Sequence, residues 1–169
     1  MKKFYIFLDF DGTMTDTEYI KKLYMQGVRK NITKIFKPES VEALNYLIDY
    51  LSKDFDVNLV ISSVWRRDMK ETIYYLNKNN IKLDKIKKID KTGHYYDENN
   101  VNHRDQEIKQ YLKEHNETKN YVAIDDEAGM FDLPIENKIE TNIKNGALSM
   151  HMIKKWINNF KNLDDEFLK

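Results

Sequence analysis

Two aspartates with a spacing suited to metal binding follow the first apolar segment of the chain. Asp9 and Asp11 come directly after residues 4–8, FYIFL, and Gly12 and Thr13 follow them. Side chains two residues apart on an extended chain point to the same side, so these carboxylates are expected to lie close together. Neighbouring anions repel each other unless a cation joins them, and Mg²⁺ prefers oxygen ligands of this kind. The pattern therefore predicts a magnesium site.

A simpler interpretation treats the same residues as a turn. Asp side chains can accept hydrogen bonds from nearby backbone N–H groups, and Gly12 can supply a positive φ. A calcium-binding EF-hand loop is excluded, because Gly12 follows Asp11 directly and leaves no third ligand position before the glycine. The magnesium site and the turn are thus the two interpretations that the local spacing leaves open.

A second acidic pair, Asp125 and Asp126, follows the apolar residues 121–124. Two adjacent carboxylates at the end of a buried strand are costly unless a cation neutralises them. A plain turn is therefore a weaker interpretation here than for the first pair. In open α/β sheets, ligands bind at the carboxyl ends of the strands, and both pairs stand at such ends. We expect the two pairs to share one site.

A hydroxyl and two guanidinium groups follow the apolar residues 57–61. Ser62 ends this segment, at a place where a serine commonly caps the next helix. Arg66 and Arg67 precede a helical pattern; a helix N-terminus favours anions, and a guanidinium can bind phosphate through two parallel hydrogen bonds. A structural cap and a pair of solvated surface charges are the alternatives.

Alternating apolar and amphipathic segments indicate the elements that position these residues. Short apolar runs predict strands over residues 4–8, 57–61, 86–89, 121–124 and 139–141. Helical spacing of apolar residues predicts helices over residues 18–30, 39–51, 67–78, 104–115 and 149–161, and the polar residues 90–102 predict a loop. Strands separated by helices are typical of an α/β fold with a three-layer, doubly wound parallel sheet.

The composition limits the class of protein. The chain has 169 residues, and we expect one domain over residues 1–169. It contains no cysteine, which excludes disulfides and thiolate metal sites and is compatible with the cytoplasm, where we expect it. No apolar run approaches the roughly 18 residues that cross a bilayer, and the short N-terminal segment does not suit a signal peptide. The 28 basic and 28 acidic residues cancel, so no overall field attracts nucleic acid.

Three strings of the sequence together resemble one family of enzymes. Residues 3–17, KFYIFLDFDGTMTDT, resemble the first motif of the haloacid dehalogenase (HAD) superfamily of phosphohydrolases. SSVWR at 62–66 and RDQEIKQYL at 104–112 are similar to strings in the HAD domain of Swiss Army Knife RNA-repair proteins and in polynucleotide phosphatases. The resemblance implies a Rossmann-like, HAD-type fold.

The resemblance also implies roles for the acidic residues. Asp9 would be the nucleophile and Asp11 the general acid and base. Mg²⁺ would bind Asp9, the backbone carbonyl of Asp11, and Asp126, while Asp125 would pair with a cation. Gly12 and Thr13 belong to the same motif and would support it.

The phosphate ligands are less sharply defined by the same resemblance. It implies that Ser62 binds a phosphate oxygen, with Ser63 as the alternative if the register shifts by one residue, and Arg66 is a further candidate. The lysine that the family usually places near the transferred phosphate is missing from its usual signature, and the resemblance of the string at 104–112 implies that Arg104 takes this role. Spacing alone leaves four lysines open for that role: Lys85, Lys87, Lys88 and Lys91.

These features predict a Mg²⁺-dependent phosphomonoester hydrolase that works through an aspartyl-phosphate. The intervals 13–62 and 62–104 have no room for a folded cap domain, so we expect an open site and a terminal phosphate of a nucleic acid as substrate. The basic stretches Lys21–Lys37 and Lys85–Lys91 could follow a phosphate backbone or be solvated faces. The alternatives are a small-molecule phosphatase such as a nucleotidase and a non-catalytic binding module with the same fold.

Overall fold

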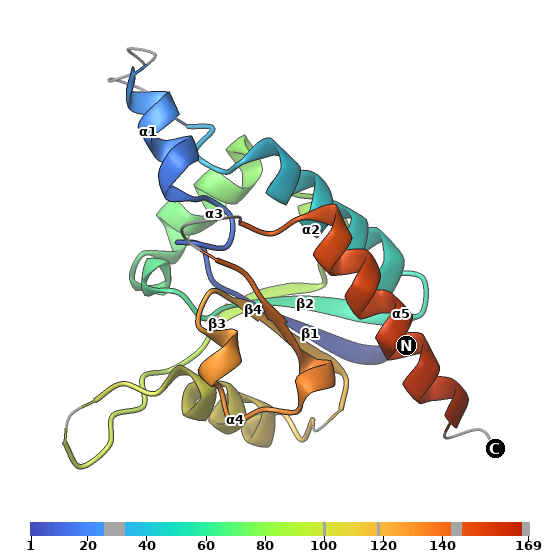
Figure 1. Ribbon diagram of the computed structural model, residues 1–169. Helices are drawn as coiled ribbons and strands as arrows, with labels where there is room; N and C mark the ends of the chain where they lie inside the picture. Colours follow the sequence, from blue (N-terminus) through green and yellow to red (C-terminus); the bar gives the residue numbers. More distant parts are fainter. Residues whose placement is uncertain (26–32, 100, 118, 143–146, 167–169) are drawn as a thin grey trace.

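A parallel sheet forms the centre of the protein (Figure 1). The computed structural model describes residues 1–25, 33–99, 101–117, 119–142 and 147–166, and of residues 161–166 the backbone only. Within them the strands lie in the order β3-β2-β1-β4-β5. Their bounds are β1 Lys2–Leu8, β2 Phe55–Ile61, β3 Lys88–Lys91, β4 Tyr121–Asp125 and β5 Lys138–Glu140. The central strand β1 is flanked by β2 and β4, so the polar residues that follow these three strands are neighbours.

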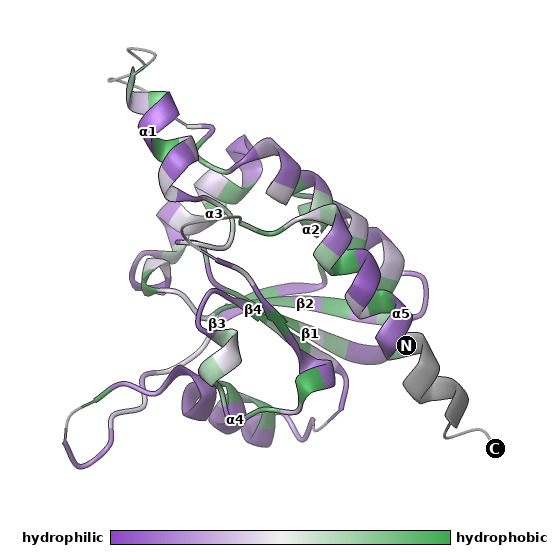
Figure 2. Ribbon diagram, in the orientation of Figure 1, coloured by the Kyte–Doolittle hydropathy of each residue, from purple (hydrophilic) through white to green (hydrophobic). Residues whose placement is uncertain are grey.

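The alternation of side chains along β1 creates two cores, one on each face of the sheet. Phe4, Ile6 and Leu8 belong to one buried cluster, whereas Tyr5 and Phe7 belong to the other. Strand side chains point to opposite faces in turn, so an apolar strand without polar interruptions must be covered on both faces. In Figure 2, hydrophobic colouring covers much of the central strands β1, β2 and β4.

Helices cover both faces and complete the three layers that the sequence predicts. α2 (Pro38–Leu51), α3 (Met69–Lys78) and α5 (Met150–Glu166) supply the first cluster, and α4 (Arg104–Glu114) supplies the second. In Figure 1, α2 and α5 lie side by side on one side of the sheet and α4 lies on the other. The three-layer, doubly wound α/β fold is therefore confirmed.

Local chemistry explains where the helices begin. Pro38 stands in the first turn of α2, where its missing N–H costs no hydrogen bond. The Asp68 carboxylate caps α3 by accepting a hydrogen bond from the Glu71 N–H, 3.0 Å away. A separate 3₁₀ turn, Val64–Arg67, precedes this cap, so α3 begins at Met69 and not at residue 67 as predicted.

The third strand lies two residues later than the predicted range 86–89. A 3₁₀ turn over Leu83–Lys85 comes before it, and the Lys87 N–H donates to the Val57 carbonyl, so pairing with β2 begins there and continues through β3. β5 likewise lies one residue earlier than predicted. The predicted helix 18–30 is described as α1 (Thr17–Met25), and its residues from 26 onward lie outside the described residues.

Two segments project at the carboxyl end of the sheet. In Figure 1, α1 and the loop after β3 extend outward on the side opposite the two termini. α1 has no buried side chain. Within the described ranges, neither interval between the strand ends forms a separate cap domain. None of the helices in these ranges has both the length and the apolarity needed to cross a membrane.

Candidate active site

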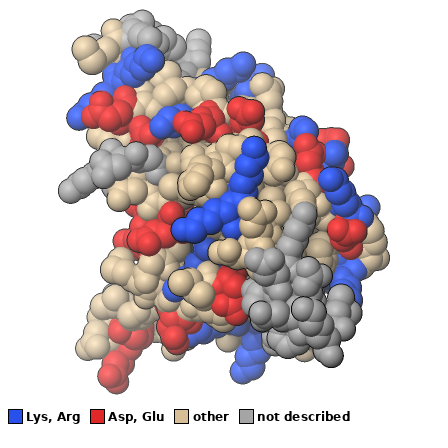
Figure 3. Space-filling view, turned by 45° about the vertical axis from the view of Figure 1, so that its right-hand side comes forward, with Lys and Arg blue, Asp and Glu red and all other residues tan. Residues whose placement is uncertain are grey.

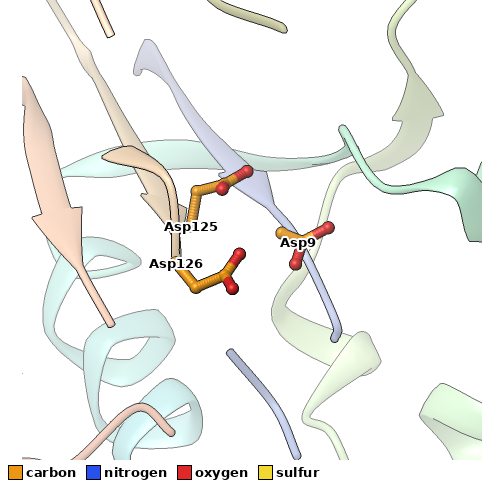
Figure 4. Close-up of side chains that lie close together, drawn as sticks. All are labelled: Asp9, Asp125 and Asp126. Carbon is orange, nitrogen blue, oxygen red and sulfur yellow. The ribbon is translucent and has the colours of Figure 1, made fainter. Parts of the chain in front are cut away.

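The ends of β1 and β4 bring three carboxylates together. Leu8 pairs with Ile124 in the parallel register, and the N–H of Asp9 donates to the Ile124 carbonyl at 3.0 Å. Asp9 therefore lies beside Asp125 and Asp126, and one oxygen from each lies within 4.8 Å of the others. Figure 4 shows the three side chains converging from the two strand ends. Such a set of oxygen ligands fits a hard divalent cation.

Crowding and burial make the charged state of this cluster unfavourable without a cation. Burial raises the pKa of Asp9 to about 8; the charges of Asp125 and Asp126 add to this shift, while Arg104 and a hydrogen bond from Ser63 oppose it. Burial is also the main cause of the raised pKa values of Asp125 and Asp126. The donor set and its uncompensated charge thus both fit Mg²⁺.

Arg104 is the cation that contacts this acidic cluster. It is the first residue of α4, and its Nη1 lies 3.1 Å from Asp9 Oδ1 and 2.6 Å from Asp125 Oδ2. Burial lowers the pKa of this guanidinium, but Asp125 and Asp9 outweigh that effect and raise it, so Arg104 stays charged. The predicted pairing of Asp125 with a cation is what the geometry shows.

Three of the four lysines left open by the sequence have partners elsewhere. Lys85 pairs with Asp49, and Lys88 pairs with Asp90. The ammonium of Lys91 donates to the Arg66 carbonyl at 3.3 Å. These contacts lie outside the acidic cluster, which favours Arg104 over these three lysines as the cation near the transferred phosphate.

Gly12 and Thr13 shape the loop between Asp11 and α1. Gly12 has φ +77°, and a Cβ at this position would lie 2.6 Å from the Asp126 Oδ2 atom. A larger residue would be strained and would also displace the Asp126 carboxylate. The Thr13 hydroxyl hydrogen-bonds to the Thr141 hydroxyl at 2.9 Å, which ties this loop to the end of β5.

Both candidate serines lie beside Asp9. The Ser62 N–H donates to the Leu8 carbonyl at 3.1 Å, so the end of β2 is held against the end of β1. Ser62 and Ser63 are both buried, and the Ser63 side chain hydrogen-bonds with Asp9. The geometry therefore keeps both serines within the site as possible phosphate ligands.

Arg66, predicted as a phosphate ligand, lies inside the protein. Its side chain is 3% exposed, and its Nη2 is 2.7 Å from Oε1 of the buried Glu107. Its Nη1 donates to the carbonyls of Ser62 and Ser63 at 3.1 and 3.2 Å. The 3₁₀ turn folds the guanidinium back under the serines, so it supports this loop and does not lie open to a ligand.

Asp11 lies apart from the acidic cluster. Its side chain is exposed, and its Oδ2 accepts a hydrogen bond from the Trp65 indole Nε1 at 3.3 Å.

Trp65 and Glu107 are the residues that the sequence reasoning missed. Trp65 belongs to the string SSVWR and Glu107 to RDQEIKQYL, but other residues of these strings were the candidates. Glu107 lies one helical turn beyond Arg104.

Most of the chain, including this site, matches the model of one known family. The model of the family described as "HAD domain in Swiss Army Knife RNA repair proteins" matches residues 5–151. The match extends from β1 into α5 and contains every residue placed in the site above. A search among curated proteins finds no match.

Proposed function

Because the chain belongs to the family of HAD domains found in Swiss Army Knife RNA repair proteins, we propose that it is a Mg²⁺-dependent phosphomonoester hydrolase. The observation that carries this proposal is the convergence of Asp9, Asp125 and Asp126 with Arg104 at the carboxyl edge of a parallel sheet. A nucleophile, a set of metal ligands and a fixed cation are the parts that phosphoryl transfer requires.

The metal would be held by carboxylates at two strand ends. Asp9 and Asp126 would bind Mg²⁺ directly, together with the backbone carbonyl of Asp11. When bound, Mg²⁺ supplies positive charge that reduces the repulsion between the phosphate and the carboxylates. Asp125 remains paired with Arg104 and holds that guanidinium beside Asp9.

The side chains would then perform two displacements at phosphorus. A carboxylate oxygen of Asp9 attacks in line and forms a new O–P bond, while the bond from phosphorus to the leaving oxygen breaks. Asp11 gives its proton to that oxygen, and later takes a proton from the water that attacks the aspartyl-phosphate and releases inorganic phosphate. Arg104 and Ser62, or Ser63 in its place, bind the non-bridging oxygens.

We infer that the substrate is a terminal phosphate of a nucleic acid. The family description names RNA repair, and the described residues place no cap domain over the strand ends, which leaves space for a polymer end. Three lysines of the basic stretches are paired with acidic residues: Lys37 with Asp16, Lys85 with Asp49, and Lys88 with Asp90. Figure 3 shows basic and acidic side chains interleaved over one face. Recognition would therefore centre on the end and its phosphate.

A comparison of substrates tests this proposal. With Mg²⁺, we expect a kcat/KM for oligonucleotides carrying a 3′-, 2′- or 5′-terminal phosphate that exceeds the value for mononucleotides. Higher values for mononucleotides would support the small-molecule phosphatase instead.

The Asp9→Asn variant tests the nucleophile in the same assay. It should lose turnover of every phosphate ester, because the amide oxygen is a poor nucleophile and a weaker metal ligand. Turnover near the wild-type rate would exclude Asp9 as the nucleophile. A wild-type protein that hydrolyses no phosphate ester would favour the non-catalytic binding module.

A further inference from the structure

The side chain of Trp65 contacts Asp11, the proposed general acid. This contact has no part in the chemical steps described above. Its indole Nε1 lies 3.3 Å from Oδ2 of Asp11. In the described part of the chain, no other side chain hydrogen-bonds or ion-pairs with this carboxylate. Asp11 is exposed and outside the acidic cluster, so this contact is what distinguishes one orientation of its side chain from the others.

The surroundings of Trp65 fix its indole independently of Asp11. The ring packs edge-on against Phe10 and Tyr75, with centroids 5.3 and 5.4 Å away, and also contacts Phe36. Its carbonyl accepts a hydrogen bond from the Thr72 hydroxyl at 2.7 Å. A ring held on several sides has one available direction for its N–H.

We propose that Trp65 is the positioning residue for Asp11, an inference that rests on the proposed function. An indole N–H is a donor only, so the oxygen facing it must act as an acceptor. In the neutral acid the carbonyl oxygen is the stronger acceptor, so the contact favours Oδ2 as the carbonyl oxygen and Oδ1 as the oxygen that carries the proton. Trp65 thereby selects the oxygen that delivers the proton: the Oδ1–H bond breaks, the leaving oxygen gains the proton, and the electron pair of its bond to phosphorus stays with it.

This role makes the effect of Trp65 depend on the leaving group. An alkoxide, such as the sugar oxygen of a nucleic-acid end, leaves poorly without a proton, whereas p-nitrophenolate delocalises its charge and leaves without one. Trp65→Phe keeps the ring and removes the donor. We expect it to lower kcat about tenfold on a phosphorylated oligonucleotide and less than about twofold on p-nitrophenyl phosphate.

The other tryptophan of the chain provides a matched control. Trp156, in α5, also donates its indole N–H, to the Glu136 carbonyl at 2.7 Å. Trp156→Phe removes the same donor away from the strand ends and should change the two rates equally or not at all. In an Asp11→Ala background, Trp65→Phe should cause no further leaving-group-dependent loss, because the two residues act as one unit.

A spectroscopic measurement tests the contact without relying on activity. The two tryptophans give two indole N–H signals in a ¹H–¹⁵N correlation spectrum. Asp11→Ala, a change at an exposed side chain, should shift the Trp65 signal and leave the Trp156 signal in place. An unshifted Trp65 signal, or an equal loss of kcat on both substrates with Trp65→Phe, would overturn the proposal. Absence of any hydrolysis by the wild-type protein would instead overturn the proposed function, and the spectrum would still report on the contact.

Discussion

At the residue scale, the chemistry of the site depends on three carboxylates that have too little positive charge around them. Arg104 contacts two of the three, Asp9 and Asp125. The third, Asp126, has a pKa raised by burial and by the charges of Asp125 and Glu127. Removing one of these negative charges and adding a cation should therefore both reduce the repulsion among the three carboxylates.

Mg²⁺ should stabilise the folded protein, and this response should require Asp126. We expect the melting temperature to rise when Mg²⁺ replaces EDTA, since an ion bound only by the folded state stabilises it. Asp126→Asn should raise the melting temperature in EDTA, because it removes a repelled charge, and should abolish the rise with Mg²⁺. Asp132→Asn is the control, because Asp132 is exposed and pairs with Lys109. An Asp126→Asn protein with the wild-type Mg²⁺ response would argue against Asp126 as a ligand.

The raised pKa of Asp9 gives the metal-free protein a defined dependence on pH. The folded-state pKa is about 8, whereas an unfolded aspartate has a pKa of about 3.9. Between these values the folded protein holds a proton that the unfolded chain has released, so stability should fall as the pH rises from about 4 to 8. Melting in EDTA should show a smaller fall for Asp9→Asn than for the wild type. Equal pH dependence of the two proteins would contradict this assignment.

At the element scale, a buried ion pair joins α4 to the 3₁₀ turn after β2. Arg66 belongs to that turn, and Glu107 lies one helical turn beyond Arg104 on α4. Glu107 also accepts a hydrogen bond from the Thr92 hydroxyl at 3.2 Å. The helix that carries Arg104 is thereby held against the loop that carries both serines.

Breaking this pair should destabilise the fold strongly. Arg66→Met leaves the Glu107 carboxylate buried without its partner, and such losses cost about 3–5 kcal/mol of unfolding free energy. The double variant Arg66→Met/Glu107→Leu should recover most of the loss, because it removes both charges. Arg67→Met is the control: this neighbouring arginine is exposed, and its loss should cost less than about 0.5 kcal/mol. Urea denaturation of the wild type, the two single variants Arg66→Met and Glu107→Leu, the double variant and Arg67→Met measures these differences. Additive effects of the two single changes would rule out the coupling.

Local patterns predicted most of the elements, with errors at their ends. The short apolar run at residues 4–8 located β1, and the helical spacing after residue 104 located α4 to within one residue. The shift of β3 from 86–89 to Lys88–Lys91 has a different origin. It depends on the turn at Leu83–Lys85 and on pairing with β2, and both involve contacts beyond the segment itself.

At the scale of the whole molecule, one sheet supports both cores and the site. The side chains of β1 enter the cluster under α2 and α5 as well as the cluster under α4. Since this one strand contributes side chains to both clusters, we infer a single domain. Thermal unfolding should show one transition, with circular dichroism and tryptophan fluorescence coinciding. Two separated transitions would mean that the layers fold independently.

The amino-acid sequence by itself determined which residues stand at the strand ends, because strand alternation and the spacing of Asp9 and Asp11 are local properties. It also indicated the family, through three short strings. Only the tertiary structure decided the partners of these residues. Arg66 meets Glu107 across 41 positions, and Asp11 meets Trp65 across 54. Such contacts depend on the order of the strands and on how the turn after β2 and helix α4 pack against the sheet, which no local pattern specifies.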